Sequence, residues 1–213
     1  MENIKLASLL EMERIEEGLY RGQSWDLGFR ALFGGQVMGQ AIAAAQQTLP
    51  ENRVCHSFHS YFLLPGDANF PVVYDVENVR DGRSFSTRRV KAIQNGRNIF
   101  YMTASFQHTE KGLEHQFADM PSVPPPEQVE PDIKVFDDSF DQLSERMKEA
   151  LVYHKPIDIR TVQTIDWNKP EVSEPKRYIW MKAEEILTSN IHLNQAALAY
   201  ASDYHFLATS LQP

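Results

Sequence analysis

One change of pattern near residue 50 limits the folds open to this chain. In FGGQVMGQAIAAAQQTLP the apolar residues recur every three or four positions, which predicts a helix that opens at Gly34 and Gly35 and ends before Pro50. The pattern then alternates in RVCHSFHSYFLLPGD, PVVYDVENVRDG, RSFSTRRVKAIQNG and RNIFYMTASFQ, which predicts four strands with turns at Asp81–Gly82 and Asn95–Gly96. One small-faced helix followed by four antiparallel strands predicts an α+β unit in which a curved sheet wraps a single central helix.

The segments that flank this unit differ from it in apolar spacing and in proline content. Before it, residues 6–16 show the spacing of an amphipathic helix, and GLYRGQS predicts a short strand. After Gln107, five prolines fall between Pro121 and Pro131, too many for the interior of a helix or sheet, so we expect an extended connector. FDDSFDQLSERMKEALVY then predicts a short amphipathic helix within that connector.

From Lys155 the first pattern begins again. KPIDIRTVQTID and RYIWMKAEEI predict strands, and SNIHLNQAALAYASD predicts an alanine-rich helix with one stripe along Ile191, Gln195, Leu198 and Ser202. YHFLATSL predicts a further strand directly after that helix. We therefore expect a first unit over residues 1–110, a proline-rich linker over residues 111–153, and the first part of a second unit over residues 154–213.

Composition and charge exclude several classes of protein. The 213 residues are 42% hydrophobic and 23% charged, which is a globular composition, and the net charge of -8 disfavours nucleic acid or anionic membranes as partners. Cys55 is the single cysteine, which excludes an internal disulfide and fits a reducing compartment. No signal peptide and no run of about 18 apolar residues is present, so we expect a soluble cytoplasmic protein. Apart from scattered pairs such as Glu114 and His115, the histidines lack acidic neighbours at ligand spacing, so we expect neither a metal site nor a cofactor.

Four motifs, in chain order, resemble one enzyme family. GLYRGQSWDLGFRALFGGQVMGQAIAAA, HSFHSYFLLPGD, YDVENVRDGRSFSTRRVKAIQNG and IFYMTASFQ together resemble the acyl-CoA thioesterase II family, known in bacteria as TesB, over about Leu6 to Pro213. The resemblance implies a double hotdog, two helix-in-sheet units in one chain, that hydrolyses acyl-CoA to free fatty acid and CoA without a covalent intermediate. It also implies a hydrolase of lipid metabolism (EC 3.1.2 class) that forms homo-oligomers through its sheets.

Asp203 is the catalytic candidate that this resemblance supplies. It matches the family aspartate that orients and activates a water together with a Thr and a Gln from later strands of the second unit. Those two residues have no counterparts before Pro213, so we expect the second unit to be incomplete. A carboxylate at a helix C-terminus faces the negative end of the helix dipole, and this position, like burial, raises its pKa toward that of a useful base. The alternative is an exposed aspartate near a helix end.

Gly34, Gly35 and Gln36 are candidates for substrate binding. They open the first long helix, where free backbone N–H groups can bind a carbonyl oxygen or a phosphate. The alternative is that the glycines only let the helix and sheet pack closely.

Histidine and arginine side chains on the predicted strands are further candidates. His59 lies mid-strand and is either a base or a structural, hydrogen-bonded histidine. Arg88 and Arg89 point to opposite faces of one strand, so at most one of them serves a given site, either on a CoA phosphate or in a salt bridge. Several phenylalanines either line an acyl tunnel or belong to the core, namely Phe58, Phe62, Phe85, Phe100 and Phe106.

The sequence leaves one other function and one other arrangement open. The chain is either a thioesterase whose assembled site uses Asp203, or a non-catalytic acyl-CoA-binding or scaffold module without a complete triad. In a third arrangement, a complementing chain supplies the missing strands. Hydrolysis of medium- and long-chain acyl-CoAs, with Asp203→Ala as a control, separates turnover from binding alone.

Overall fold

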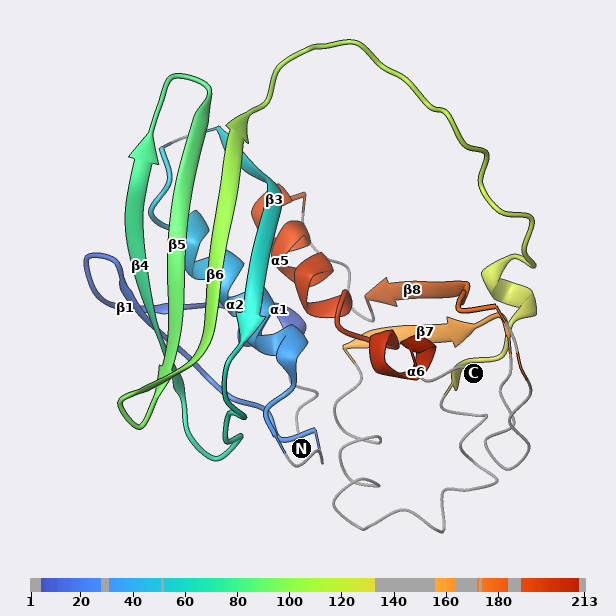
Figure 1. Cartoon of the computed structure of the whole chain (residues 1–213), viewed down its shortest axis with the longest axis horizontal. Helices are drawn as coiled ribbons and strands as arrows, with labels where there is room; N and C mark the ends of the chain where they lie inside the picture. The colour runs from blue at the N-terminus through green and yellow to red at the C-terminus, as the bar shows by residue number, and fades with distance from the viewer. Residues whose placement is uncertain are drawn as a thin grey trace.

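A six-stranded antiparallel sheet wraps one helix in the first part of the molecule (Figure 1). The structure, a computed structural model, describes residues 5–27, 31–50, 52–132, 156–163, 172, 174–183 and 189–210. The strand order in the sheet is β1-β2-β4-β5-β6-β3. The strands are β1 (Glu13–Glu16), β2 (Leu19–Gly22), β3 (Arg53–Phe62), β4 (Val72–Asp81), β5 (Phe85–Gln94) and β6 (Arg97–His108). The predicted α+β hotdog class and the four long strands are confirmed.

The turns of the sheet follow the chemistry of their residues. Asn95 and Gly96 lie at φ 49° and φ 70°, the left-handed conformation that a tight Asn-Gly hairpin between β5 and β6 requires. Between β4 and β5, the Gly82 N–H donates to Phe85 O at 2.8 Å. Gly18, at φ 72°, closes the hairpin of β1 and β2. That hairpin overrides the helical spacing predicted for residues 6–16, where only α1 (Leu6–Leu10) is helical.

The helix α2 (Gly34–Gln46) is enclosed by the sheet and is buried over nearly its whole length. Two glutamines on it, Gln36 and Gln40, are buried, and each makes side-chain hydrogen bonds. Gln40 Nε2 donates to Leu9 O at 2.8 Å, and its Oε1 accepts from Tyr74 Oη at 2.8 Å. These bonds explain how polar side chains are accommodated in a core of otherwise small and apolar groups.

A second helix, α5 (Ile191–Ala201), packs antiparallel against α2 at very short range. A Cβ on Gly35 would lie 2.2 Å from Tyr200 O, and a Cβ on Gly39 would lie 2.9 Å from Ala196 O, so both positions require glycine. The buried residues of α5 are Ala196, Ala197, Ala199, Tyr200 and Ala201. The predicted alanine-rich helix is present, and its small residues, not the larger apolar ones of the stripe, make the close contact.

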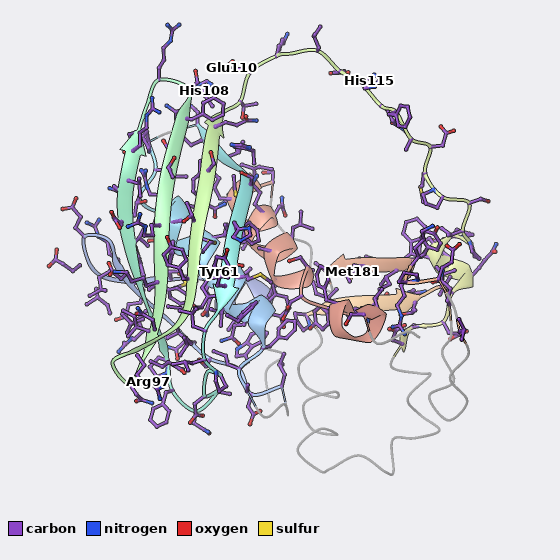
Figure 2. The ribbon with its side chains drawn as sticks, viewed as in Figure 1. Tyr61, Arg97, His108, Glu110, His115 and Met181 are labelled. Atoms are coloured by element: carbon purple, nitrogen blue, oxygen red, sulfur yellow. The ribbon has the colours of Figure 1, made fainter. Side chains whose placement is uncertain are left out.

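The part of the molecule beyond the sheet contains a short connector helix and a small two-stranded sheet. The connector leaves β6 as a long arc, along which His115 lies well away from the sheet, and reaches the 3-10 turn η1 (Pro126–Gln128) (Figure 2). The two predicted strands are present as β7 (Ile157–Thr161) and β8 (Ile179–Ala183), and the structure shows that they pair antiparallel. The amphipathic helix predicted for residues 136–153 lies outside the described residues, and the three domain boundaries stay a prediction.

The segment after α5 is a helix and not the predicted strand. A tight turn with His205 at φ 66° leads into α6 (Phe206–Ser210), whose Thr209 N–H donates to His205 O at 2.9 Å. The alternation in YHFLATSL is too short to outweigh this turn. No helix within the described ranges has the length and apolar character needed to cross a membrane.

Candidate active site

Asp203 lies just beyond α5 and faces the first residues of α2. Its Oδ2 accepts a hydrogen bond from the Gly35 N–H at 2.9 Å. The N-cap residue of α2, Phe33, offers no side-chain cap, so a carboxylate from a distant segment takes that role. The sequence placed Asp203 at the unfavourable C-terminal end of one helix, and the structure adds the favourable N-terminal end of another.

Burial sets the acidity of this carboxyl group. Desolvation raises the pKa of Asp203 above the ordinary aspartate value, and the hydrogen bond from Gly35 only partly opposes this shift. The outcome is a partly buried carboxylate that binds a proton more readily than an exposed aspartate. This is the property expected of a general base.

Two of the predicted binding residues contact Asp203 directly or nearly so. Gly35 supplies the hydrogen bond, and a Cβ on Gly34 would lie 2.7 Å from both Asp203 Oδ2 and Phe62 Cζ. Because Gly34 has no side chain, the Asp203 carboxylate and the Phe62 ring can occupy the space beside it. Gln36 is different, because its Oε1 accepts from the Trp25 N–H at 3.0 Å and its Nε2 donates to Gln23 O at 3.1 Å. Its side chain fixes the lead-in segment and does not face the site.

An apolar cavity of about 460 Å³ opens beside Asp203. Among the lining residues that the structure describes, Asp203 is the only ionisable one. The other lining residues are Ala31, Leu32, Gly34, Val37, Phe62, Leu63, Leu64, Pro65, Gly66, Ile99 and Phe100. The cavity thus joins the start of α2 to the end of β3, the loop after it and the start of β6, and it presents one carboxylate to an apolar space.

Only two of the five candidate phenylalanines line this cavity. The rings of Phe62 and Phe100 lie 5.2 Å apart, and Phe62 remains 53% exposed, at the cavity surface. Phe106 is buried in the core, while Phe85 is half exposed and contacts His56. Alternation along a strand predicts which face a residue takes, but not which end of the strand borders a cavity.

The residues behind Asp203 form an aromatic cluster that the sequence did not single out. The ring of Phe33 lies 5.2 Å from that of Tyr200 and 4.7 Å from that of Tyr204. Burial raises the pKa of Tyr204, and the nearby charge of Asp203 adds to this effect. The repeat of tyrosine four residues apart around Asp203, in YASDY, is the signal that identifies the cluster.

His59 and Arg88 do not lie with Asp203. His59 is exposed on β3, with its ring 4.9 Å from that of Tyr61. Arg88 is fully buried beyond the opposite end of α2, where its Nε donates to Thr48 Oγ1 at 2.7 Å and its Nη2 lies 2.9 Å from Asp81 Oδ1. A guanidinium so enclosed stabilises the sheet and is not placed to bind a phosphate.

Arg89, the neighbour of Arg88, also lies outside the site, and the described residues hold no group of potential metal ligands. Arg89 pairs with Glu77 at 3.0 Å, with both side chains largely exposed. Over the residues that the structure describes, no three His, Cys, Asp or Glu side chains are grouped as metal ligands.

Two models of known families match this chain. One, described as the acyl-CoA thioesterase N-terminal domain, matches residues 22–107, and the other, described as acyl-CoA thioesterase, matches residues 149–213. Acyl-CoA thioesterase 2 of Haemophilus influenzae is 42% identical over 208 residues, which cover 98% of this chain and 72% of that protein. Acyl-coenzyme A thioesterase 8 of Homo sapiens is 36% identical over 222 residues, covering all of this chain and 69% of that protein.

Solved structures agree with these matches. The acyl-CoA thioesterase II TesB2 from Mycobacterium marinum superposes with a TM-score of 0.72 at 33% identity, covering 96% of this chain and 69% of that one. A hot dog fold protein of unknown function from Alicyclobacillus acidocaldarius superposes with a TM-score of 0.68 at 22% identity, a likeness that concerns the fold alone.

Proposed function

This chain belongs to the acyl-CoA thioesterase family, and we therefore propose that it hydrolyses acyl-CoA to a free acid and CoA, with Asp203 as the base that activates water. The observation that carries the assignment of Asp203 is its position. Within the described part of the chain it is the only ionisable group that lines the apolar cavity, and it accepts a hydrogen bond from the Gly35 N–H at the start of α2.

The chemistry follows from the two oxygens of the carboxylate. Gly35 holds Oδ2, which leaves Oδ1 to accept the proton of a water. As the water oxygen bonds to the thioester carbon, Asp203 takes that proton. When the C–S bond breaks, Asp203 returns the proton to the sulfur of CoA. A raised pKa favours this cycle, since the carboxyl group must both accept and release a proton.

Besides a base, the reaction needs a hydrogen-bond donor for the thioester carbonyl oxygen, which becomes negative when water adds. The start of α2 supplies such a donor. The first N–H groups of a helix have no partner inside the helix, and the helix dipole favours negative charge there. Because Gly35 is engaged with Asp203, we assign the Gly34 N–H to the carbonyl oxygen of the thioester. The acyl chain then extends into the apolar cavity along Phe62 and Phe100.

Turnover of Asp203 variants tests the assignment. Asp203→Asn is expected to lower kcat for medium- and long-chain acyl-CoAs by about 10²–10⁴-fold, because an amide cannot take a proton from water. Asp75→Asn, which alters an exposed carboxylate that pairs with Lys91 at 3.4 Å, is the matched control and is expected to keep wild-type turnover.

Two results would contradict the proposal. Unchanged turnover in Asp203→Asn would remove Asp203 from the mechanism. A wild-type chain that binds acyl-CoA saturably without hydrolysing it would instead be a binding module.

We also propose that the chain acts in the cytoplasm as an assembly formed through its sheet. The strand β3 is an edge of the six-stranded sheet. Its first residues contact α5 through Gln195, but Tyr61 near its other end is 56% exposed, and an exposed edge of this kind favours pairing with another chain. The free thiol of Cys55 is compatible with a reducing compartment. Light scattering of the purified chain tests the assembly, and a mass of 24.5 kDa, that of one chain, would contradict it.

A further inference from the structure

The turn that carries Asp203 is held on its far side by a second group of side chains. His205, two residues after Asp203, places its Nε2 3.2 Å from Asp132 Oδ2. Asp132 also accepts hydrogen bonds from the Thr161 N–H at 2.7 Å and from Thr161 Oγ1 at 2.8 Å. His205 Nδ1 lies 3.3 Å from Arg177 Nη1. We call these four residues, Asp132, Thr161, Arg177 and His205, the Asp132 clasp.

Each hydrogen bond of the clasp has a defined direction. A guanidinium only donates, so His205 Nδ1 accepts from Arg177, and Nε2 carries the proton that is donated to Asp132. Burial pushes the pKa of Asp132 upward, but the hydrogen bonds from His205 and Thr161 outweigh it and hold the pKa below the ordinary value. Asp132 therefore stays an anionic acceptor, and the two nitrogens of His205 have different partners.

The clasp joins four segments that are distant in the sequence. Asp132 follows η1 in the connector, Thr161 ends β7, Arg177 precedes β8, and His205 follows α5. On the other side of Asp203, the Ser202 N–H donates to Leu198 O at 2.9 Å and so continues α5. Asp203 thus lies between the end of α5 and the clasp, and the residue after it, Tyr204, donates its N–H to Ala201 O at 3.2 Å.

The backbone of His205 indicates that the clasp imposes its position. A histidine at φ 66° occupies a conformation that few residues other than glycine adopt, and such conformations persist where the surrounding contacts determine them. The backbone of this histidine is held by Thr209, whose N–H and Oγ1 donate to His205 O at 2.9 and 2.8 Å, and its side chain is held by Asp132 and Arg177.

We propose that Asp132 and His205 are positioning residues for Asp203, which fix the turn so that its carboxylate stays against the Gly35 N–H and the cavity. This role rests on the proposed function of Asp203. It acts through the backbone, since the side chains of the clasp bind one another. The titratable neighbour of Asp203 itself is Tyr204, whereas Asp132 and Arg177 are the charged groups that face His205.

Two substitutions at His205 separate its side chain from its backbone. Asparagine tolerates the left-handed conformation better than glutamine, but it is shorter than histidine and would not reach Asp132. Glutamine is long enough for its Nε2 to donate to Asp132 in place of the imidazole. If the clasp positions Asp203, His205→Gln keeps more activity than His205→Asn; if only the backbone matters, the order is reversed.

The expected kinetic result is a loss in kcat with little change in KM. His205→Asn and Asp132→Asn should each lower kcat for acyl-CoA hydrolysis by about 10- to 100-fold, the scale of a misplaced catalytic group. The double variant, with His205→Asn and Asp132→Asn together, should be no slower than the slower single variant. Each substitution alone already removes the hydrogen bond between His205 and Asp132. Glu174→Gln, which removes an exposed ion pair with Lys176 at 3.0 Å in the segment before β8, is the matched control.

A pH titration measures the pKa of Asp203, which should not change if the clasp only stabilises the fold. A loosened turn admits water to Asp203 and returns its pKa toward the ordinary value. The acidic limb of kcat/KM should therefore move to lower pH in both clasp variants and stay in place in Glu174→Gln. A ¹³C NMR titration of the Asp203 carboxyl signal, assigned by its loss in Asp203→Asn, measures the same shift without turnover.

The outcomes are distinguishable. Clasp variants that match Glu174→Gln in kcat and in the NMR titration would overturn the positioning role while leaving Asp203 as the base. Full activity in Asp203→Asn would instead overturn the proposed function. In that case a lowered Asp203 pKa in the clasp variants would still support the clasp, and an unchanged one would remove it as well.

Discussion

Asp203 combines two properties that oppose each other within one residue. The apolar cavity and partial burial disfavour its charge, while the Gly35 N–H at 2.9 Å stabilises that charge. Because burial is the larger effect, the ionised carboxylate costs the folded protein stability. If Asp203 acts as the proposed base, the group that is needed in its charged form lies in surroundings that favour the neutral form, a common compromise in active sites.

This conflict predicts that Asp203→Asn stabilises the protein. The folded-state pKa of Asp203 lies above its unfolded value, so its contribution to stability is full at low pH and is lost as pH rises through the folded pKa. An amide avoids that loss and can still accept from Gly35. Near neutral pH we expect a higher Tm for Asp203→Asn, at about 2–4 °C per kcal/mol for a chain of this size.

The pH dependence of that gain checks its cause. Calorimetry should find the Tm difference between Asp203→Asn and wild type shrinking as pH falls through the raised pKa, since both side chains are then neutral. Asp75→Asn, at an exposed pair with Lys91, should bring no gain. A lower Tm for Asp203→Asn at neutral pH would contradict the account.

At the residue scale, the sequence identified candidate residues but not their neighbours. Asp203, Gly34 and Gly35 lie together in the structure, yet the hydrogen bond between Asp203 and Gly35 spans 168 positions, which local spacing does not reveal. Arg88 shows the reverse. Its position on a strand face was predictable, but its burial among Thr48 and Asp81 depends on the folded sheet.

At the scale of elements, the predictions of turns and helices were confirmed where the residues of the segment itself determine its backbone conformation. The Asn95–Gly96 turn and the helix that opens at Gly34 follow from backbone conformation and spacing alone. The stripe on α5 did not indicate the buried face, because close packing on glycine favours alanine over leucine, and Leu198 is 70% exposed. The helix α6 was missed because His205 adopts a left-handed backbone that no local motif signals.

The close crossing of α2 and α5 predicts the effect of Gly39→Ala. The new Cβ would lie 2.9 Å from Ala196 O, a backbone atom, and 2.9 Å from Leu10 Cδ2. Alanine is the better helix former by up to about 1 kcal/mol, but overpacking costs about 1–3 kcal/mol, so we expect a net loss of stability in urea denaturation. Acyl-CoA hydrolysis should fall too, because displacing α5 moves Asp203.

A matched glycine in the connector isolates this effect. A Cβ on Gly112 would meet nothing within 4 Å, so Gly112→Ala should unfold at the wild-type urea concentration and keep its activity. If Gly39→Ala were instead more stable than wild type, the helices would have room to separate, and the close approach would not determine this interface.

At the scale of the whole molecule, α5 joins the two halves of the chain. It comes from the second half, yet its buried alanines contribute to the core of the first. Gln195 makes the connection specific at the edge strand β3, where the pairing with β6 shifts register between Cys55 and Ser57. Its Oε1 accepts from the Cys55 N–H at 2.9 Å, and its Nε2 donates to Cys55 O at 2.6 Å.

Gln195→Leu should therefore destabilise the molecule as a whole. Leucine would leave the N–H and C=O of Cys55 without these partners in a partly buried place, at a cost of about 1–3 kcal/mol. Urea denaturation should give a lower midpoint with an unchanged slope, because a single cooperative unit still unfolds. Leu198→Gln, on the exposed face of the same helix, should change the midpoint little. Two separate transitions in Gln195→Leu would mean that the halves unfold independently, and that α5 is an accessory to the first sheet and not the element that unites the chain.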